Sequence, residues 1–327
     1  MIAFRPHFLL AIAGVVALSG CASVTPAPSA TPSAASDSYP VTIDNCGFEL
    51  TVTSAPQRVV TIKSTSTELL LALGLGDRII GQAFADGPLP PALDTLGRTI
   101  PVVSDVAPSS ETLLALEPDF IVAGWESNFT ADSAGDRIGL STLGIGSYVS
   151  PAACTQPGYQ PATLSFENVF DYILETGDIF GVPVAAAQLV DSQRTALAAI
   201  EPNQDGLTAL WWSSGNDTPY VGAGIGAPQL VLETAGLSNI AAEIDDTWSP
   251  LSWEAIIAAD PDVIVLMDAS WSTAESKIAA LEANPATAMM TAVVNQRFLV
   301  IPFAAGEAGV RTVEAAASVA EQLAALG

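Results

Sequence analysis

Histidine, the side chain that most often acts in acid–base catalysis, is scarce in this 327-residue sequence. The only histidine is His7, in an N-terminal segment that we expect to be cleaved off. Without it the mature chain has no Ser-His-Asp or Cys-His centre, no His-ligated metal site and no His proton shuttle. The stretch "STSTE" from Ser64 lacks S-x-x-K spacing, and the adjacent acids Asp245 and Asp246 are typical of a solvated turn. The sequence therefore predicts a binding protein that is not an enzyme and uses no metal and no cofactor.

Tryptophan gives the clearest indication of a ligand. All six tryptophans lie in or beside loops that follow predicted strands, at Trp125, Trp211, Trp212, Trp248, Trp253 and Trp271. We expect Trp211 and Trp253 to point into the protein. The other four suit stacking against a flat aromatic ligand. For any one of these four, packing beneath a loop is an equally good explanation.

Two cations stand where they could meet an anionic group of that ligand. One of only two lysines, Lys63, directly follows a predicted buried strand, and Arg311 begins the last predicted helix. Backbone N–H groups and the helix dipole also favour an anion at a helix start. Lys63 and Arg311 could hold a phosphate or carboxylate, with the hydroxyls of Ser64 and Thr65 as further donors. The alternatives are an ion pair between Arg311 and Glu307 and an ordinary surface position for Lys63.

The loops after the predicted strands supply the other candidate contacts. Open α/β sheets bind ligands at the carboxyl ends of their strands, so we expect these loops from both halves of the chain to line a cleft. The candidate ligand-binding residues are Lys63, Ser64, Thr65, Trp125, Glu126, Asn128, Tyr148, Trp212, Ser213, Tyr220, Trp248, Asp268, Trp271, Phe303 and Arg311.

The segments between these loops predict an α/β fold. A hairpin over 39–52 with its turn at Asn-Cys-Gly precedes strands at 58–62, 78–83, 120–124 and 146–149, and helices at 68–76, 111–116 and 130–143. After two successive helical stretches at 165–200, the alternation restarts with strands at 207–214, 263–267 and 297–302, and helices at 228–235, 253–259, 274–282 and 311–326. Such alternation predicts parallel sheets with helices on both faces. We therefore expect an N-terminal lobe at 39–164, a helical connector at 165–200 and a C-terminal lobe at 201–327.

One element of this pattern occurs twice. "ETLLALEPDFIVAG" begins at Glu111 and "EAIIAADPDVIVLM" at Glu254, 143 residues later, and both place Pro-Asp between a helical stretch and an apolar strand. "ELLLALGLGDRII", from Glu68, likewise corresponds to "QLVLETAGLSNI", from Gln229. Two matches in the same order indicate two similar lobes.

The N-terminus predicts export. Residues 1–20 combine a basic residue, an apolar run and small residues, as in a secretory signal peptide. Leu18-Ser19-Gly20-Cys21 resembles a bacterial lipobox, in which Cys21 is lipidated, and the alternative is a plain signal peptide. Residues 21–38 are small and Pro-rich, which is typical of a flexible tether. We expect the protein on the extracytoplasmic face of the membrane, held only by a lipid on Cys21.

Charge and cysteine content fit that location. Removing Arg5 with the leader leaves 9 basic and 35 acidic residues, a formal charge of −26. Such a surface repels nucleic acid and anionic membranes, and we expect a monomer. The remaining cysteines, Cys46 and Cys154, form an even pair in an oxidising compartment, which favours a disulfide over two buried thiols.

These features together resemble the substrate-binding lipoproteins of ABC importers for iron-siderophores and cobalamin. The resemblance rests on the lipobox, the tether, "APQRVVTI", the duplicated E-x-x-x-A-x-x-PD-x-x-V element and the connector, and it covers about residues 40–327. It implies two similar lobes, each a parallel-sheet α/β sandwich, with the ligand cleft between them and little closure across a rigid connector. It also implies that Glu111 and Glu254 dock on a permease dimer with its ATPase. The alternative is that each Glu favours its helix N-terminus through the dipole.

A finer resemblance concerns the ligand. "IKSTSTELLLALGLGDRI", "GWESNF", "YVSPAAC", "WWSSGNDTPYVGAGIGAPQ", "DTWSPLSWEA" and "PFAAGEAGVR" are similar to a clade proposed to bind a precursor of the deazaflavin coenzyme factor 420. A flat ring with one phosphate would suit four tryptophans and two cations. Cobalamin or a ferric siderophore is the alternative ligand. An extracellular ligand-sensing receptor is the alternative class.

Overall fold

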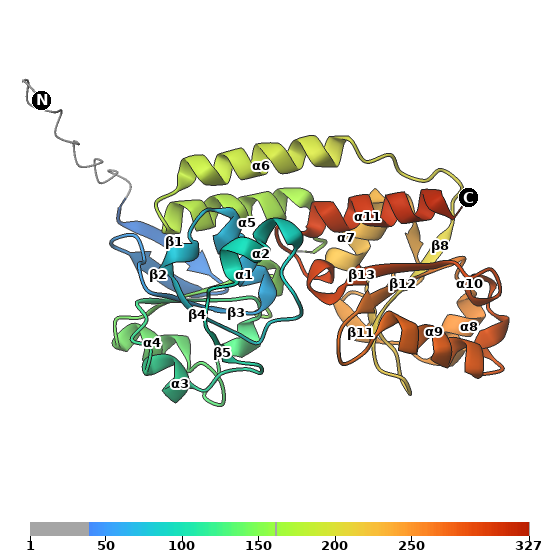
Figure 1. The fold of residues 1–327 in the computed structure, drawn as a ribbon, viewed down its shortest axis with the longest axis horizontal. Coiled ribbons are helices and arrows are strands. Elements are labelled where there is room, and N and C mark those ends of the chain that lie inside the picture. Colours follow the sequence, from blue (N-terminus) through green and yellow to red (C-terminus); the bar gives the residue numbers. More distant parts are fainter. Residues whose placement is uncertain (1–38, 161, 327) are drawn as a thin grey trace, which may run out of the picture. The chain divides into compact units, whose positions relative to one another are not determined.

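The computed structural model describes residues 39–160 and 162–326. The predicted signal peptide, His7, the predicted lipidation site Cys21 and the predicted tether lie outside those residues. Within the described part of the chain, no helix has both the length and the apolar character needed to cross a membrane. The described residues form two α/β lobes, which lie side by side in Figure 1.

An antiparallel hairpin opens the N-terminal lobe. Strands β1 (Val41–Asn45) and β2 (Phe48–Val52) pair across a turn at Cys46 and Gly47, both of which have positive φ. A disulfide joins Cys46 to Cys154, which follows strand β7, and this confirms the sequence prediction. The Asn45 side chain supports the same junction, because it donates to Val149 O and accepts from Val149 N. The hairpin is thereby tied to the main sheet.

The N-lobe sheet is parallel throughout, in the order β5-β4-β3-β6-β7. Its strands are β3 (Val59–Ile62), β4 (Ile79–Ala83), β5 (Val102–Ser104), β6 (Phe120–Ala123) and β7 (Gly146–Val149). Helices α1 (Ser64–Ala72), α2 (Pro91–Gly97), α3 (Ser110–Leu114) and α4 (Arg137–Thr142) connect them. Strands β3 and β6 are buried on both faces, which explains their continuous apolar runs. Helix α2 was not predicted, and α4 is shorter than the helix expected over 130–143.

The C-lobe sheet is mixed. Strands β8 (Thr208–Ser214), β12 (Val263–Asp268) and β13 (Phe298–Pro302) are parallel, and β10 (Ser238–Asn239) adds to β8. Strands β9 (Tyr220–Gly222) and β11 (Trp248–Pro250) extend the sheet antiparallel. The two-lobed α/β class is confirmed, but the expectation of an all-parallel C-lobe sheet is corrected. The Gly-rich loop at 215–226 folds back as a hairpin, because Gly215 takes a positive φ at its turn.

Five helices complete the C-lobe. They are α7 (Ala227–Thr234), α8 (Trp253–Ala259), α9 (Ala274–Ala283), α10 (Thr291–Val294) and α11 (Thr312–Ala325). Helix α8 has the bounds that the sequence predicted, and α10 is an addition to the prediction.

The duplicated element has the same construction in both lobes. Ser109 and Ser252 cap α3 and α8, and their hydroxyls accept from backbone N–H groups three residues on. The Pro-Asp aspartates start the strands that follow. The Asp119 carboxylate accepts from the backbone N–H groups of residues 57 and 58 at 2.8 and 3.0 Å, and the Asp262 carboxylate accepts from the Thr208 N–H at 2.9 Å. Each aspartate therefore fastens its strand to the neighbouring central strand.

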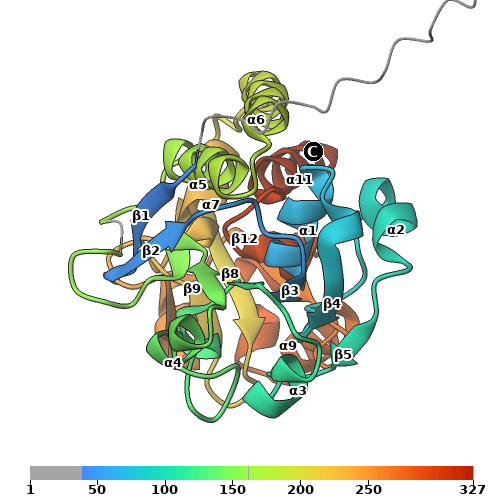
Figure 2. The same ribbon diagram turned by 90° about the vertical axis from the view of Figure 1, so that its left-hand side faces the viewer.

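Two helices join the lobes. Helices α5 (Phe166–Ile179) and α6 (Pro183–Ala198) follow one another without a strand, as the sequence predicted for 165–200. Figures 1 and 2 both show α6 running alongside α5 and extending to α11. One apolar cluster runs from N-lobe residues such as Leu69, through Phe170 and Val190 of these helices, to C-lobe residues such as Val231 and Val319. The lobes therefore share a continuous core.

Candidate functional site

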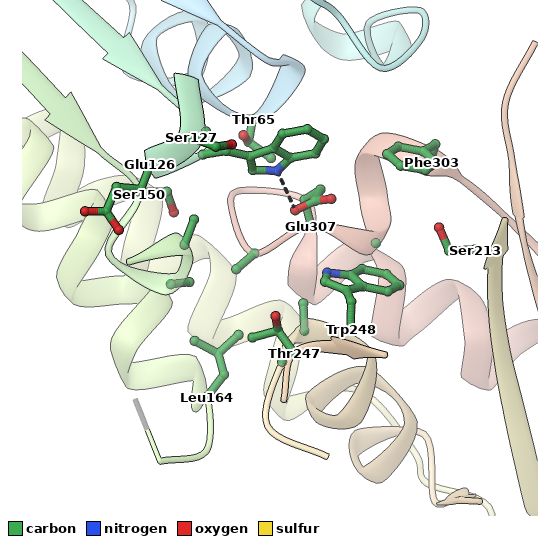
Figure 3. Close-up of a pocket in the computed structure, with 18 of the residues that line it drawn as sticks. Thr65, Glu126, Ser127, Ser150, Leu164, Ser213, Thr247, Trp248, Phe303 and Glu307 are labelled. Atoms are coloured by element: carbon green, nitrogen blue, oxygen red, sulfur yellow. Dashed lines mark hydrogen bonds between the residues drawn. The ribbon is translucent and has the colours of Figure 1, made fainter. Parts of the chain in front are cut away.

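A cavity of about 470 Å³ lies between the lobes (Figure 3). The N-lobe contributes residues that follow β6 and β7 and one residue of α1. The C-lobe contributes the end of β8, the β9–β11 pair and the segment after β13. Most of the walls are thus carboxyl ends of parallel strands, which is where open α/β sheets leave room for ligands. A volume in this range suits a drug-sized molecule.

The structure brings eight of the fifteen candidate residues to this cavity. They are Thr65, Trp125, Glu126, Ser213, Tyr220, Trp248, Trp271 and Phe303. The other seven do not line it: Lys63, Ser64, Asn128, Tyr148, Trp212, Asp268 and Arg311. The aromatic part of the prediction therefore matches the cavity geometry much better than the cationic part.

Aromatic rings dominate the C-lobe side of the cavity. Tyr220 and Trp248 project from paired strands and stack with their ring centroids 6.3 Å apart and an interplanar angle of 15°. Trp271 and Phe303 meet edge to face at 5.3 Å. Trp271 is 62% exposed, so most of its ring remains free to contact a ligand. Flat, exposed ring faces of this kind suit stacking against a planar molecule.

Lys63 does not line the cavity; its side chain lies against the Trp125 ring of the N-lobe wall. Its side chain is 2% exposed and pairs with the Asp86 carboxylate, which is 4% exposed. The ammonium group lies 3.7 Å from the Trp125 ring centroid and 4.3 Å from that of Phe84. A buried charge needs a partner, and Asp86, in the loop that follows the neighbouring strand β4, supplies it. Ser64 belongs to the same arrangement, because its hydroxyl accepts from the Asp86 N–H at 2.8 Å.

Arg311 is also committed to a carboxylate, although not to Glu307. Its guanidinium forms a two-pronged pair with Glu68 of α1, with Nε 2.7 Å from Oε2, and donates to Pro88 O. Both side chains are buried. Burial raises the pKa of Glu68 to about 7, and the hydrogen bond from Arg311 opposes that rise. The pair joins the two lobes, so the prediction that Arg311 meets a ligand anion is corrected.

Four further candidates serve the scaffold. Trp212 is fully buried in the C-lobe core, where its indole N–H donates to Ser214 O. The Tyr148 hydroxyl is buried and donates to Glu175. Asn128 is buried and accepts from the Trp125 N–H. Asp268 accepts from the Ala274 N–H at the start of α9. Trp211 is buried and Trp253 half-buried, in line with their predicted inward direction.

Glu307 is an acidic lining residue that is absent from the fifteen candidates, although it lies in a loop that the sequence places at the cleft. It lines the cavity after β13, and one of its oxygens accepts from the Trp125 indole N–H at 3.3 Å, drawn dashed in Figure 3. Burial raises its pKa to about 7; Asp86 adds to this, whereas Lys63 and the Trp125 bond oppose it. A charged residue in "PFAAGEAGVR", directly after a predicted strand, was the available signal.

The described residues that form the cavity walls include acidic side chains and no lysine or arginine. Of the described residues that line the cavity, Glu126 and Glu307 are ionisable acids, and none is a lysine or arginine. Glu126 is held by the loop after β7, because its carboxylate accepts from the Thr155 N–H and hydroxyl at 2.6 and 2.5 Å. In the described residues, no three His, Cys, Asp or Glu side chains gather where they could hold a metal ion.

The two glutamates of the duplicated element lie away from the cavity. Glu111 and Glu254 are exposed and each is the second residue of its helix, α3 or α8. Figure 1 shows both helices on the side of the lobes opposite α6. One acid per lobe therefore faces solvent on that side.

Several known proteins are similar to this chain in sequence or in fold. The family described as "Periplasmic binding protein" matches residues 59–305. An ABC transporter substrate-binding lipoprotein of Bacillus subtilis (strain 168), YvrC, is 26% identical over 316 residues, which span 94% of this chain and 93% of that protein. A cobalamin-binding protein of Halobacterium salinarum (strain ATCC 29341 / DSM 671 / R1) is 28% identical over 239 residues, 70% of this chain and 58% of that protein. The crystal structure of an ABC-type Fe3+-hydroxamate transport system from Saccharomonospora viridis DSM 43017 superposes with a TM-score of 0.74 at 26% identity, covering 87% of this chain and 99% of that one.

Proposed function

Because the chain belongs to the periplasmic binding protein family, we propose that it is the extracytoplasmic substrate-binding component of an ABC importer. It captures a small organic ligand between its lobes and delivers it to a permease. The observation that carries this proposal is the cavity, which both lobes line at the carboxyl ends of their sheets. Similarity to an ABC transporter substrate-binding lipoprotein over nearly the full length of both chains supports it.

Tryptophan fluorescence tests the binding step. Trp125, Trp248 and Trp271 line the cavity, so an occupant that contacts them should change the emission. The mature protein should be titrated with deazaflavin, flavin, corrinoid and ferric hydroxamate compounds, and the same samples should be assayed for chemical conversion of each. Saturable quenching without conversion is expected for a transport ligand. If no compound quenches, or if the bound compound is converted, the proposal fails.

The ligand we propose is a precursor of a deazaflavin coenzyme. The rings of Tyr220, Trp248 and Trp271 offer flat surfaces for a planar ring system, which supports this choice. Cobalamin and a ferric hydroxamate are the alternatives, since proteins similar to this chain bear those names. Competition among the three in the fluorescence titration ranks them directly.

We propose that Glu111 and Glu254 orient the protein on the permease. Each exposed ion pair with a permease arginine would contribute only about 0–1 kcal/mol, so the two act mainly by fixing orientation. The double substitution Glu111→Arg/Glu254→Arg should abolish uptake by cells while leaving ligand binding unchanged. Glu275→Arg is the matched control, because Glu275 is also exposed at the second position of a helix, α9. Loss of uptake in the control, or loss of binding in the double variant, would count against docking.

We propose that residues 1–20 are a signal peptide and that a lipid on Cys21 anchors the protein through the tether at 21–38. The similarity to a lipoprotein along 93% of that protein's length supports this. Cys21→Ser should release the protein from the membrane into the medium and abolish incorporation of labelled fatty acid. A variant that stays membrane-bound would contradict the anchor.

We also propose that 165–200 acts as a rigid connector between lobes at 39–164 and 201–327. The shared core and the Glu68–Arg311 pair support this, because both would have to be disrupted for a large hinge motion. Small-angle scattering with and without ligand should therefore show little change in the radius of gyration. A change as large as that of a hinge-closing binding protein would contradict it.

A further inference from the structure

The charges around the cavity carry an inference about the class of ligand. The carboxylates that line the cavity belong to Glu126 and Glu307, and no lysine or arginine is among the described residues that form the walls. An anionic ligand group would therefore meet carboxylates of its own sign. In a desolvated cavity that repulsion is stronger than on the surface. The formal charge of −25 on the whole chain opposes the approach of anions as well.

The two nearest candidate cations cannot readily turn to a ligand. The Lys63 ammonium lies behind the Trp125 ring and pairs with Asp86, and both of these charged side chains are almost completely buried. Arg311 binds Glu68 in the same way. Moving either cation to a ligand would strip a buried carboxylate of its partner, which is strongly unfavourable. Both cations therefore stabilise the protein's own acids.

Of the two carboxylates that line the cavity, that of Glu307 can accept more additional hydrogen bonds. Glu126 already accepts from the Thr155 N–H and hydroxyl and from Gln156. Among the described residues, Trp125 alone donates a hydrogen bond to the Glu307 carboxylate, at 3.3 Å, whereas a carboxylate can accept about four. Figure 3 shows Glu307 near the centre of the close-up, above Trp248. Because both residues line the same cavity, we expect a ligand stacked on Trp248 to lie near this carboxylate.

From this geometry we infer that the cavity selects a flat ligand that is uncharged or cationic, with hydroxyl or N–H donors directed at Glu307, and that it rejects ligands carrying a phosphate or carboxylate there. This inference rests on the proposed binding function and narrows it. It replaces the sequence-based expectation of a phosphate held by Lys63 and Arg311. A deazaflavin precursor satisfies it only in a form without a phosphate.

The test uses two probes with the same ring and different charge, riboflavin and its 5′-phosphate. Their dissociation constants are measured by tryptophan quenching at pH 8, where Glu307 is ionised because that pH lies above its pKa of about 7. We expect the phosphate to weaken binding by roughly tenfold or more. Cationic proflavine, paired with the anionic dye anilinonaphthalene sulfonate, repeats the comparison on other rings.

Two variants assign the effect to Glu307. In Glu307→Gln the dissociation constants of the two flavins should differ by less than about threefold, since the side chain keeps its shape but loses its charge. Glu321→Gln removes one charge from the exposed surface of α11 and should leave the ratio unchanged. Thermal unfolding of both variants verifies that they fold.

Each outcome separates the inference from the function beneath it. Equal or tighter binding of the phosphorylated probe overturns the inference and leaves the binding function standing. A ratio that does not respond to Glu307→Gln, or that responds equally to Glu321→Gln, overturns the role of Glu307. If none of the four probes and none of the panel compounds binds at all, the proposed function fails and the inference fails with it.

Discussion

The two lobes are built from one repeated element, yet they differ at a pair of corresponding helices. Glu68 of α1 corresponds in sequence to Gln229 of α7, and both are buried. The Glu68 carboxylate forms an ion pair with Arg311 of the other lobe. Gln229 stays within its own lobe, bonded to Glu233 and Asn239. By contrast, the capping serines and the Pro-Asp aspartates do the same work in both lobes. The residues that are the same in both repeats stabilise each lobe internally. Where the repeats differ, at Glu68 and Gln229, the Glu68 side chain contacts the other lobe.

The largest expected effect comes from the interlobe pair. Arg311→Met should lower the free energy of unfolding by about 3–5 kcal/mol, because it leaves the buried Glu68 carboxylate unpaired. Gln229→Met, its counterpart in the repeat, should cost only about 1 kcal/mol, since it removes hydrogen bonds and no ion pair. Urea denaturation followed by circular dichroism measures both.

A double variant sharpens that comparison. Glu68→Gln/Arg311→Met removes both charges together and should be less destabilised than Arg311→Met alone. Arg98→Met is the control, because its pair with Asp94 is largely exposed and should contribute less than about 1 kcal/mol. If Arg311→Met and Arg98→Met lower the free energy of unfolding equally, the buried interlobe pair is no more important for stability than an exposed pair.

Glu307 gives the next largest effect, and it depends on pH. Its pKa in the folded protein is about 7, above its usual value of 4.5. Burial and the nearby Asp86 carboxylate raise this pKa, whereas Lys63 and the hydrogen bond from Trp125 lower it. A raised pKa favours folding at low pH, and this contribution is lost as the pH rises from 4.5 through 7. The wild type should therefore lose on the order of 2 kcal/mol relative to Glu307→Gln between pH 5 and pH 8. Parallel curves for the two proteins across that range would refute the shift.

The repeated aspartates should have smaller and similar effects. Asp119→Ala and Asp262→Ala each remove hydrogen bonds from backbone N–H groups at the start of a central strand. Each should cost about 1–3 kcal/mol. Hydrogen exchange of β3 and β8 tells the lobes apart, since each substitution should speed exchange mainly in its own sheet. If one substitution strongly destabilises its lobe and the other has no effect, the two aspartates do not have equivalent roles.

The smallest effect concerns the exposed glutamates. Glu111→Gln and Glu254→Gln should each change the free energy of unfolding by about 0.3–1 kcal/mol, through the helix dipole alone. Glu275→Gln at the same helix position should match them. A clearly larger loss for either docking candidate would mean that it stabilises the fold in a way the contacts do not explain.

The fold was predictable from the sequence wherever local pattern determines it. Apolar runs identified β3 and β6, and a serine cap with Pro-Asp beyond it bounded α8 correctly. Strand β9 was missed, because its three residues lie in a glycine-rich segment and are defined by pairing with β8 and β11. Local propensity carries no information about such a partner.

The site was predictable only in part, for a related reason. Trp125, Trp248 and Trp271 were placed correctly at the cavity, since loops after strands converge at one edge of a sheet. Lys63 and Arg311 were misplaced, because their partners Asp86 and Glu68 lie 23 and 243 residues away. Trp212 was misplaced as well, because both faces of the C-lobe sheet are covered.

The core shared by the lobes has a consequence for folding. Leu69, Phe170, Val231 and Val319 belong to one apolar cluster, so neither lobe owns a complete core. An excised half would expose the apolar faces that now meet α5 and α6, and such a surface invites aggregation. We therefore expect the two lobes to fold as one unit, although each also has a smaller apolar cluster of its own. Unfolding of the intact protein should be a single cooperative transition, and neither half should refold alone.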